Sequence, residues 1–185
     1  MHNGRGKIIV ISAPSGTGKS TIINRLLKIR PELVLSVSAT TRAPRTGEVD
    51  GVAYDFVTRE RFMEMVERGE FLEYAEYVGE FYGTPKIPID KCTESGVNVL
   101  LEIEVQGARQ IMELEQDAVT IFIVPPNMKE LERRLRSRGT DSEEKLAARM
   151  ERATLELQEK THYAHIVVND RVDRAAKEIL SIIDR

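Results

Sequence analysis

The 185-residue sequence predicts a doubly wound α/β fold, in which helices cover both faces of a parallel β-sheet. The first observation is that short apolar runs alternate along the chain with segments of helical periodicity. The second is that a glycine-rich loop directly follows the first apolar run. The third is that residues 38–90 interrupt the alternation with short strand-like pieces, which indicates a small β-rich lobe inserted into the core.

Composition limits the class of protein. Hydrophobic residues make up 41% and charged residues 31% of the chain, which is typical of a soluble globular domain, and the length suits one domain over residues 1–185. The net charge of −3 argues against non-specific binding of nucleic acid and against a polybasic membrane anchor. The single Cys92 excludes an internal disulfide, and no apolar run is long enough to span a bilayer. We expect a cytoplasmic protein.

The first predicted strand, residues 7–12, leads into a loop that reads Ser-Ala-Pro-Ser-Gly-Thr-Gly-Lys-Ser-Thr, and a helix is predicted over 18–29. This is the pattern of a phosphate-binding loop, which indicates a nucleoside triphosphate as ligand. Ala13 takes the place of the first glycine of the usual pattern, the mildest such change. The residues expected to bind the phosphates are Ala13, Pro14, Ser15, Gly16, Thr17, Gly18, Lys19, Ser20 and Thr21.

Each conspicuous residue of this loop has a chemical reason. Gly16 and Gly18 let consecutive backbone N–H groups face phosphate oxygens, where a Cβ would block the approach. Lys19 can reach the β- and γ-phosphates, and the Ser20 hydroxyl is placed to hold Mg²⁺. The positive end of the helix dipole adds to this attraction.

The other core elements continue the alternation, so ligands are expected at the carboxyl ends of the strands. Further strands are predicted over 33–37, 97–103, 118–124 and 165–168, and further helices over 104–114, 127–137, 142–160 and 171–184.

Two segments interrupt this core. The inserted lobe is predicted to hold strand-like pieces at 53–57, 71–78 and 80–82 around a helix over 59–68. The polar stretch 138–143 separates two arginine-bearing helices, with Gly139 ending the first and Ser142 beginning the second. Loops of this kind beside a phosphate site often close over it, so a lid is expected over about 134–150. The core then comprises about 1–37, 91–126 and 160–185.

A pair of arginines opens the inserted lobe. Arg42 and Arg45 flank Pro44, which excludes a helix and so excludes a helical face as the reason for their spacing. Two guanidinium groups that converge with the hydroxyl of Tyr54 suit a phosphate monoester. On this segment alone, a solvated basic loop is an equal alternative.

These motifs together resemble the guanylate kinase family along the whole chain. The pattern Thr41-Arg42-x-x-Arg45-x-x-Glu48-x-x-Gly51-x-x-Tyr54-x-Phe56 fits the signature of that family. Shorter motifs follow in the family's order, namely Phe71-Leu-Glu73, Tyr82-Gly83-Thr84, Gln106-Gly107, Pro125-Pro126, Arg138-Gly139-Thr140 and Val168-Asn169-Asp170. The resemblance implies a fold like that of the P-loop nucleoside monophosphate kinases, with a core, an acceptor-binding lobe and a lid.

The resemblance also implies a reaction and roles for single residues. The activity would be the phosphorylation of GMP to GDP by ATP with Mg²⁺, with no nucleic-acid or membrane partner. Arg42, Arg45, Tyr54 and Tyr82 would hold the phosphate of GMP, and Ser38, Glu73 and Thr84 would read guanine. Glu104, where the family usually has Asp, would contact the nucleoside. Asn169 would lie beside adenine, and the arginines that close on the polyphosphate would be Arg134, Arg138 and Arg149.

The chemistry of Glu73 supports guanine independently of the resemblance. Guanine presents N1–H and 2-NH₂ as adjacent donors, and an ionised carboxylate accepts both, whereas adenine N1 is an acceptor that a carboxylate repels. No His-Arg-Asp loop supplies a base, and a phosphate acceptor needs none because its second pKa is about 6. Glu102, at the end of an apolar run, is a candidate for an acidic group near Mg²⁺ through water, or else a strand-end carboxylate with a structural partner.

Other functions account for parts of the sequence less well. His162 and His165 are close in sequence, but without a third ligand nearby we expect packing or exposure and no metal site. A catalytically inactive guanylate kinase-like module that binds phosphopeptides is one alternative, although such modules typically degrade the phosphate loop that is whole here. A small sugar-phosphate kinase is the other, and the base-reading residues argue against it.

Overall fold

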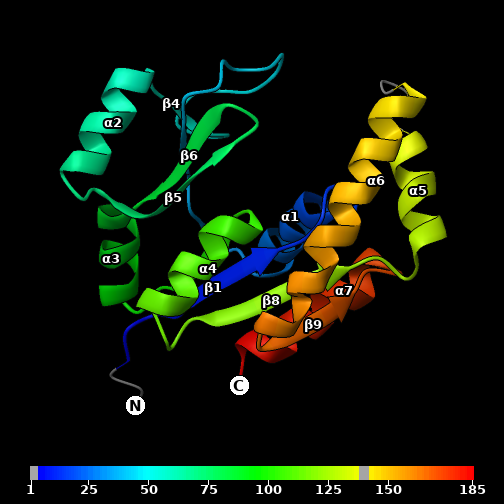
Figure 1. The fold of residues 1–185 in the computed structure, drawn as a ribbon. Helices are drawn as coiled ribbons and strands as arrows, with labels where there is room; N and C mark the ends of the chain where they lie inside the picture. The colour runs from blue at the N-terminus through cyan, green and yellow to red at the C-terminus, as the bar shows by residue number, and fades with distance from the viewer. Residues whose placement is uncertain (1–3, 138–141) are drawn as a thin grey trace.

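The computed structural model describes residues 4–137 and 142–185. Its core is a five-stranded parallel sheet in the order β2-β7-β1-β8-β9 (Figure 1). The strand bounds are β1 Ile8–Ser12, β2 Val34–Leu35, β7 Val99–Glu102, β8 Val119–Val124 and β9 His165–Val168. Because β1 is central and almost wholly apolar, it is buried along its length, as predicted for a strand covered on both faces.

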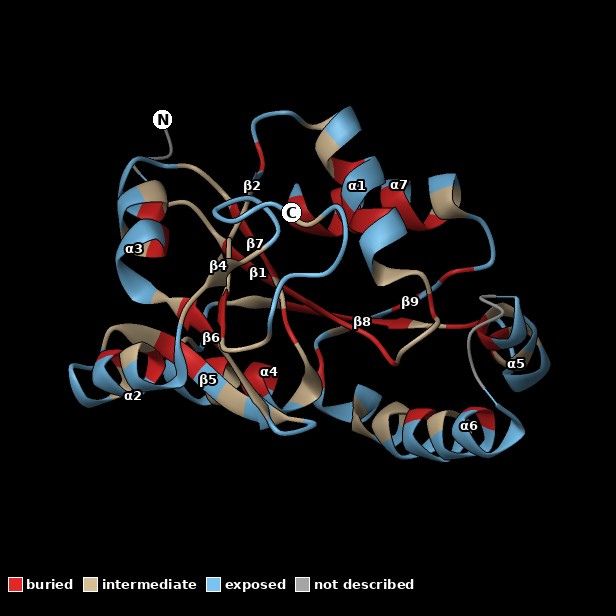
Figure 2. Ribbon diagram, turned by 90° about the horizontal axis from the view of Figure 1, so that it is seen from above, coloured by how far each residue is buried: buried red, intermediate tan, exposed pale blue. Residues whose placement is uncertain are grey.

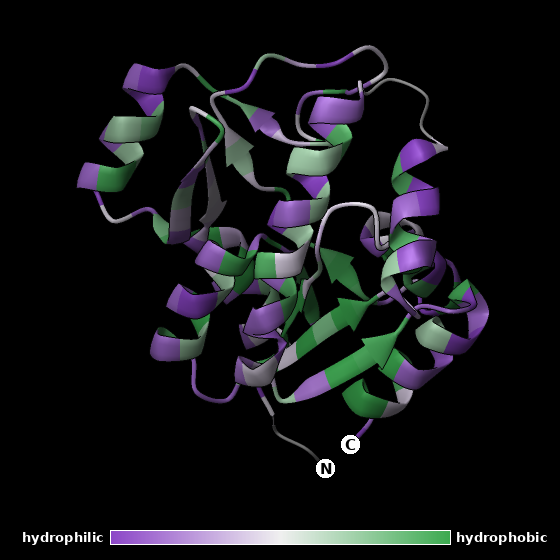
Figure 3. Ribbon diagram, turned by 45° about the vertical axis from the view of Figure 1, so that its right-hand side comes forward, coloured by the Kyte–Doolittle hydropathy of each residue, from purple (hydrophilic) through white to green (hydrophobic). Residues whose placement is uncertain are grey.

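Helices cover both faces of this sheet, which confirms the doubly wound architecture (Figure 2). On one face, α1 (Lys19–Ile29) and α7 (Val172–Ile183) pack against alternate side chains of β1, including Ile9 and Ile11. On the other face, α3 (Lys86–Glu94) and α4 (Val105–Leu114) pack against Ile8 and Val10. The hydrophobic strands and the hydrophilic outer faces of the helices are clear in Figure 3.

The inserted lobe is a separate four-stranded sheet in the order β4-β3-β6-β5. Its strands are β3 Ala39–Thr40, β4 Asp55–Phe56, β5 Phe71–Tyr77 and β6 Glu80–Pro85, and α2 (Arg59–Glu67) covers one face. Phe62 of α2 stacks on Phe71 and Phe81, with ring centroids 4.5 and 5.4 Å apart, so the lobe has its own small core.

Two further helices lie toward the β8–β9 edge of the core sheet, and the inserted lobe lies toward the other edge, near α3 (Figures 1 and 2). They are α5 (Met128–Arg136) and α6 (Glu143–Gln158), packed through Leu131, Leu135, Leu146 and Ala153. The Ser142 hydroxyl accepts a hydrogen bond from the Lys145 backbone N–H at 3.4 Å, so Ser142 is the N-cap of α6 as predicted. Gly139, predicted to end the preceding helix, lies outside the described residues.

The structure differs from the sequence predictions in several elements. Helix α3 was not predicted; Pro88 is its third residue, where the backbone N–H would have no intrahelical partner, so the helix tolerates it. Strand β2 is only two residues long, and β3 was not predicted. The helix predicted over 142–160 ends at Gln158 and continues as a short 3₁₀ helix, Glu159–His162. Among the described residues, no helix has the length and apolarity needed to cross a membrane.

Candidate active site

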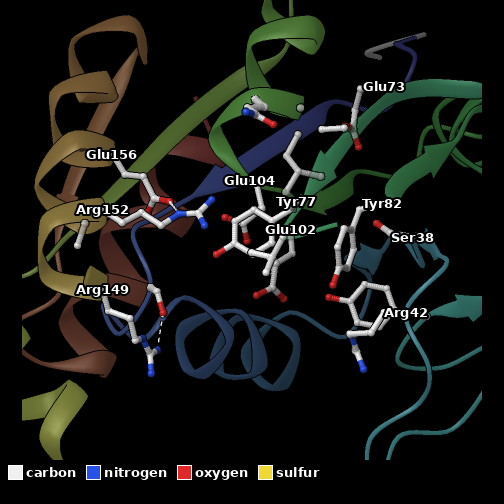
Figure 4. A pocket seen from close by; sticks show the side chains of 18 of the residues that line it. Ser38, Arg42, Glu73, Tyr77, Tyr82, Glu102, Glu104, Arg149, Arg152 and Glu156 are labelled. Carbon is white, nitrogen blue, oxygen red and sulfur yellow. Dashed lines mark hydrogen bonds and ion pairs between the residues drawn. The ribbon is translucent and has the colours of Figure 1, made fainter. Parts of the chain in front are cut away.

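A cavity of about 620 Å³ lies between the inserted lobe, the carboxyl end of β7 and helix α6 (Figure 4). Ser15 of the glycine-rich loop lines it on one side, and Ser38, Tyr82 and Glu73 line it on the other. Between these sides lie Glu102, the last residue of β7, and Glu104, which follows that strand. The fold therefore brings the phosphate loop and the inserted lobe to one space at the strand carboxyl ends, as expected for a doubly wound sheet.

The glycine-rich loop has the geometry of an anion-binding turn. Gly16 and Gly18 have φ values of 88° and 91°, in the left-handed region that favours glycine. Gly18 is the N-cap of α1, and the Thr17 hydroxyl donates to the Pro14 carbonyl at 2.7 Å within the loop. Ala13 is only 3% exposed, so its methyl group is buried directly after β1. The N–H groups at the start of α1 thus face the place where phosphates are expected.

Carboxylates at the end of β7 contact the two functional side chains at the start of α1. Lys19 Nζ lies 3.6 Å from Glu104 Oε1 and donates to the Ile103 carbonyl at 3.4 Å. The Ser20 hydroxyl donates to Glu102 Oε1 at 2.7 Å. Ser20 and Glu102 thus place two oxygen ligands side by side, a donor set that suits Mg²⁺. Thr21 is exposed on the same turn.

The two histidines near the start of β9 were expected to pack or to be exposed. Within residues 4–137 and 142–185, no group of three or more His, Cys, Asp or Glu side chains could hold a metal ion. His162 is exposed and its Nε2 lies 3.9 Å from Glu159 Oε2. His165 is half-buried at the start of β9.

Glu73 is the most unusual charged group of the cavity. It is 5% exposed, and the Thr84 hydroxyl donates a short hydrogen bond to its Oε1 from the neighbouring strand. Burial raises the pKa of Glu73 to about 7, although the hydrogen bond from Thr84 acts in the opposite direction. Thr84, expected to read guanine, is fully buried and is not among the residues that line the cavity. In this structure its hydroxyl group contacts the Glu73 carboxylate instead.

The arginine pair of the lobe faces the cavity beside two tyrosines. Arg42 donates two hydrogen bonds of 2.9 Å to the Glu48 carboxylate, and its guanidinium lies 5.4 Å from the Tyr54 ring centroid. Tyr54 in turn packs edge-on against Tyr82, with centroids 5.9 Å apart. Arg45 is exposed and lines the cavity. Glu48 therefore holds the Arg42 guanidinium beside the rings of two tyrosines that line the cavity.

Three residues expected to bind the polyphosphate or to lie beside adenine, Arg134, Asn169 and Arg149, donate hydrogen bonds to the glycine-rich loop. Arg134 donates to the Thr17 carbonyl at 3.1 Å and to the Asn169 carbonyl at 2.9 Å. Asn169 Nδ2 donates to the same Thr17 carbonyl at 2.6 Å, while its buried Oδ1 has no hydrogen-bond partner among the described residues. Arg149 reaches the loop from α6 and donates to Ser15 Oγ at 2.7 Å. Arg138 lies outside the described residues.

Comparison with known proteins identifies the family. A family model described as guanylate kinase matches residues 5–185. The chain belongs to the guanylate kinase family. It is 50% identical to a guanylate kinase of Clostridioides difficile over 97% of this chain and 87% of that protein, and 49% identical to one of Trichodesmium erythraeum over 96% of both. A crystal structure of guanylate kinase from Anaplasma phagocytophilum superposes with a TM-score of 0.82 at 38% identity, covering 98% of this chain and 86% of that one.

The structure adds cavity residues that the guanylate kinase motifs did not indicate. Arg152 of α6 donates from Nε to Glu156 at 2.9 Å, and its guanidinium lies 3.9 Å from the centroid of the Tyr77 ring (Figure 4). Helix α6 thus contacts β5 of the inserted lobe directly across the cavity. A helical spacing of three and four residues places Arg149, Arg152 and Glu156 on one face, which could have been read from the sequence. Tyr77 lies in the strand-like piece predicted over 71–78, in the same stretch as Glu73, but no role was predicted for its ring.

Proposed function

We propose that the protein transfers the γ-phosphoryl group of ATP to the phosphate of GMP, giving ADP and GDP. The observation that carries this proposal is a single cavity lined by the phosphate loop and by a buried carboxylate on the inserted lobe. A loop of this kind binds a nucleoside triphosphate, and the carboxylate suits a base with two adjacent donors. Membership of the guanylate kinase family supports the same pair of substrates.

The inserted lobe, residues 38–90, would bind GMP. Ionised Glu73 would accept hydrogen bonds from guanine N1–H and 2-NH₂, with Thr84 holding the carboxylate and Ser38 at the cavity wall. Arg42, Arg45, Tyr54 and Tyr82 would hold the phosphate. Arg42 would turn part of its double hydrogen bond with Glu48 toward the phosphate oxygens. Glu104, beside Lys19, would face the nucleoside.

The loop Ala13–Thr21 would bind the polyphosphate of ATP through its backbone N–H groups. Lys19 would exchange Glu104 for the β- and γ-phosphates, where charge accumulates during the transfer. Mg²⁺ would be held by Ser20 directly and by Glu102 through water, and when bound it neutralises phosphate charge. Asn169 would lie beside the adenine, with its unpaired Oδ1 as an acceptor.

The transfer itself requires positioning and charge neutralisation more than proton removal. An oxygen of the GMP phosphate attacks the γ-phosphorus, and the bond to the β–γ bridging oxygen breaks, so ADP leaves with that oxygen. Since the second pKa of a phosphate monoester is about 6, the attacking oxygen is mostly deprotonated at neutral pH. Arg134, Arg138 and Arg149 would stabilise the charge on the transferred group, within a lid over about 134–150.

A coupled assay of ADP formation tests the proposal. We expect turnover with ATP and GMP, and little with AMP, CMP, UMP or no acceptor. Equal turnover without any acceptor, or with a sugar phosphate in place of GMP, would contradict the assignment of the acceptor. Binding of a phosphopeptide with no turnover on any nucleotide would favour a binding module. The cytoplasmic location stays a prediction.

A further inference from the structure

Helix α4 contains a glycine whose backbone does not require one. Gly107 is the third residue of α4, and its φ lies outside the left-handed region where glycine is needed. Among ordinary residues glycine is the poorest helix former after proline, so alanine would favour the helix at this position. The reason for the glycine must therefore come from its surroundings.

The surroundings of Gly107 are the carboxylate of Glu73. A Cβ built on Gly107 would lie 2.8 Å from Glu73 Cδ and 3.4 Å from Oε1, with Oε2 nearer still. Every neighbour that the Cβ would meet most closely belongs to this one carboxyl group. Gly107 is buried and lines the same cavity as Glu73.

Other contacts hold both partners, and they hold the helix more firmly than the carboxylate. The Thr84 hydroxyl donates to Glu73 Oε1, and Thr84 is paired with Glu73 in the β5–β6 ladder. The side chain of Gln110 fixes the distance between α4 and β5, because it donates to the Tyr74 carbonyl at 2.7 Å and accepts from the Tyr74 backbone N–H at 3.3 Å. An added methyl group at Gly107 would therefore displace the carboxylate and leave the helix in place.

We infer that Gly107 is a specificity-determining residue, because its missing side chain provides the space in which the Glu73 carboxylate faces the base of the acceptor. The ligand class is a nucleoside monophosphate whose base has two adjacent hydrogen-bond donors, and this inference rests on the proposed function. A carboxylate turned away from the cavity loses one or both of those hydrogen bonds. The phosphate loop, which does not touch Gly107, keeps its affinity for ATP.

The test is a double-mutant cycle of Gly107→Ala and Glu73→Asp. In the wild-type background, Gly107→Ala should lower kcat/KM for GMP about tenfold to a hundredfold, with KM for ATP changed less than about twofold. Aspartate is one methylene shorter than glutamate and leaves room for the added methyl group, so Gly107→Ala in the Glu73→Asp background should cost at most about twofold to threefold. Glu113→Ala, at an exposed position of the same helix, is the matched control and should change neither constant.

Thermal unfolding provides a readout that does not depend on activity. Gly107→Ala should lower Tm in the wild-type background and raise or preserve it in the Glu73→Asp background, because alanine then only improves the helix. A Gly107→Ala protein that fails to fold while the double variant folds supports the same clash. Equal losses in both backgrounds, or unchanged use of GMP by Gly107→Ala, would overturn the inference. Wild-type protein without GMP-dependent turnover would refute the proposed function, and the Tm comparison would still decide the clash.

Discussion

Glu73, which we propose binds guanine, shows how the burial of one side chain can set the pH range of ligand binding. Its pKa is raised to about 7 by burial, so the free protein exchanges the proton of this group near neutrality. Only the ionised form offers two acceptors to guanine. We therefore expect kcat/KM for GMP to fall as pH decreases through about 7, and GMP binding to release a proton when the pH lies near or below that pKa.

The control for this prediction separates Glu73 from the substrate. The phosphate of GMP protonates with a pKa of about 6 and also lowers kcat/KM at acid pH. Glu73→Gln should keep the decrease near pH 6 and lose the one near pH 7, while discrimination between GMP and AMP falls about tenfold to a hundredfold. The same pH profile in both proteins would exclude Glu73 as the titrating group.

Lys19 gives a second prediction at the level of single residues. Among the described residues its ammonium group makes one ion pair, with Glu104, and one hydrogen bond, with the Ile103 carbonyl, so Lys19→Met removes little that stabilises the fold. The loss of the charge that we propose meets the β–γ bridge of ATP should lower kcat about 10²–10³-fold. Steady-state rates and urea unfolding of Lys19→Met test both parts, and a variant with most of its activity would remove Lys19 from the mechanism.

Among the elements, the β5–β6 hairpin carries an unusual backbone conformation. Tyr77 pairs with Glu80, so Val78 and Gly79 form a two-residue loop with φ values of 53° and 80°. This is the pattern of a type I′ turn, which favours Asn-Gly, and a β-branched residue at positive φ is strained. Val78→Asn should raise the free energy of unfolding by about 1 kcal/mol, measured in urea.

A valine elsewhere provides the comparison for this hairpin. Val52 is 71% exposed, close to the 77% of Val78, and its φ is not positive. Val52→Asn should leave the free energy of unfolding nearly unchanged. If both variants behave alike, the gain at Val78 comes from the polar side chain and not from the turn.

The helices and strands also show how much of the fold could be predicted from the sequence. The apolar runs that became β1, β7, β8 and β9 were predicted, and so were helices α1, α2, α4, α5, α6 and α7, because their signals are periodic and continuous. Helix α3 was not predicted because Pro88 is typical of a turn and the helix has only a short amphipathic face. The side chains against which that face packs include Ile8 and Val10 of β1, which are remote in sequence. Strand β3, of two residues, exists only through pairing with β4 and β6, which are remote in sequence.

At the scale of the molecule, some parts of the candidate site could be predicted from the sequence and others could not. The phosphate loop was predictable because its chemistry lies in consecutive residues. The stack of Arg152 on Tyr77 joins residues on two elements that no local pattern connects. The carbonyl contacts of Arg134 likewise depend on where α5 meets the loop. Contacts of this kind follow from the packing of whole elements and cannot be deduced from spacing.

The arrangement of the two arginine-bearing sides predicts a movement. Arg42 and Arg45 lie on the inserted lobe, and Arg149 lies on α6, so both sides must approach the core sheet to reach one transferred phosphoryl group. Distance labels at Glu67 of α2 and Glu144 of α6, both exposed and introduced as cysteines with Cys92→Ser, should move closer with GMP and an ATP analogue together. An unchanged distance with both ligands, compared with neither, would contradict closure.

The position of β1 in the middle of the core sheet has a consequence for the newly made chain. Its two edges pair with β7 and β8, whose residues are synthesised about 90 to 110 positions later. Until then the backbone N–H and C=O groups of β1 have no strand partners and its apolar side chains have no sheet to pack in. The four strands of the second sheet, from Ala39 to Pro85, pair only with one another. We therefore expect the inserted lobe to be ordered on the ribosome before the core sheet that carries the glycine-rich loop.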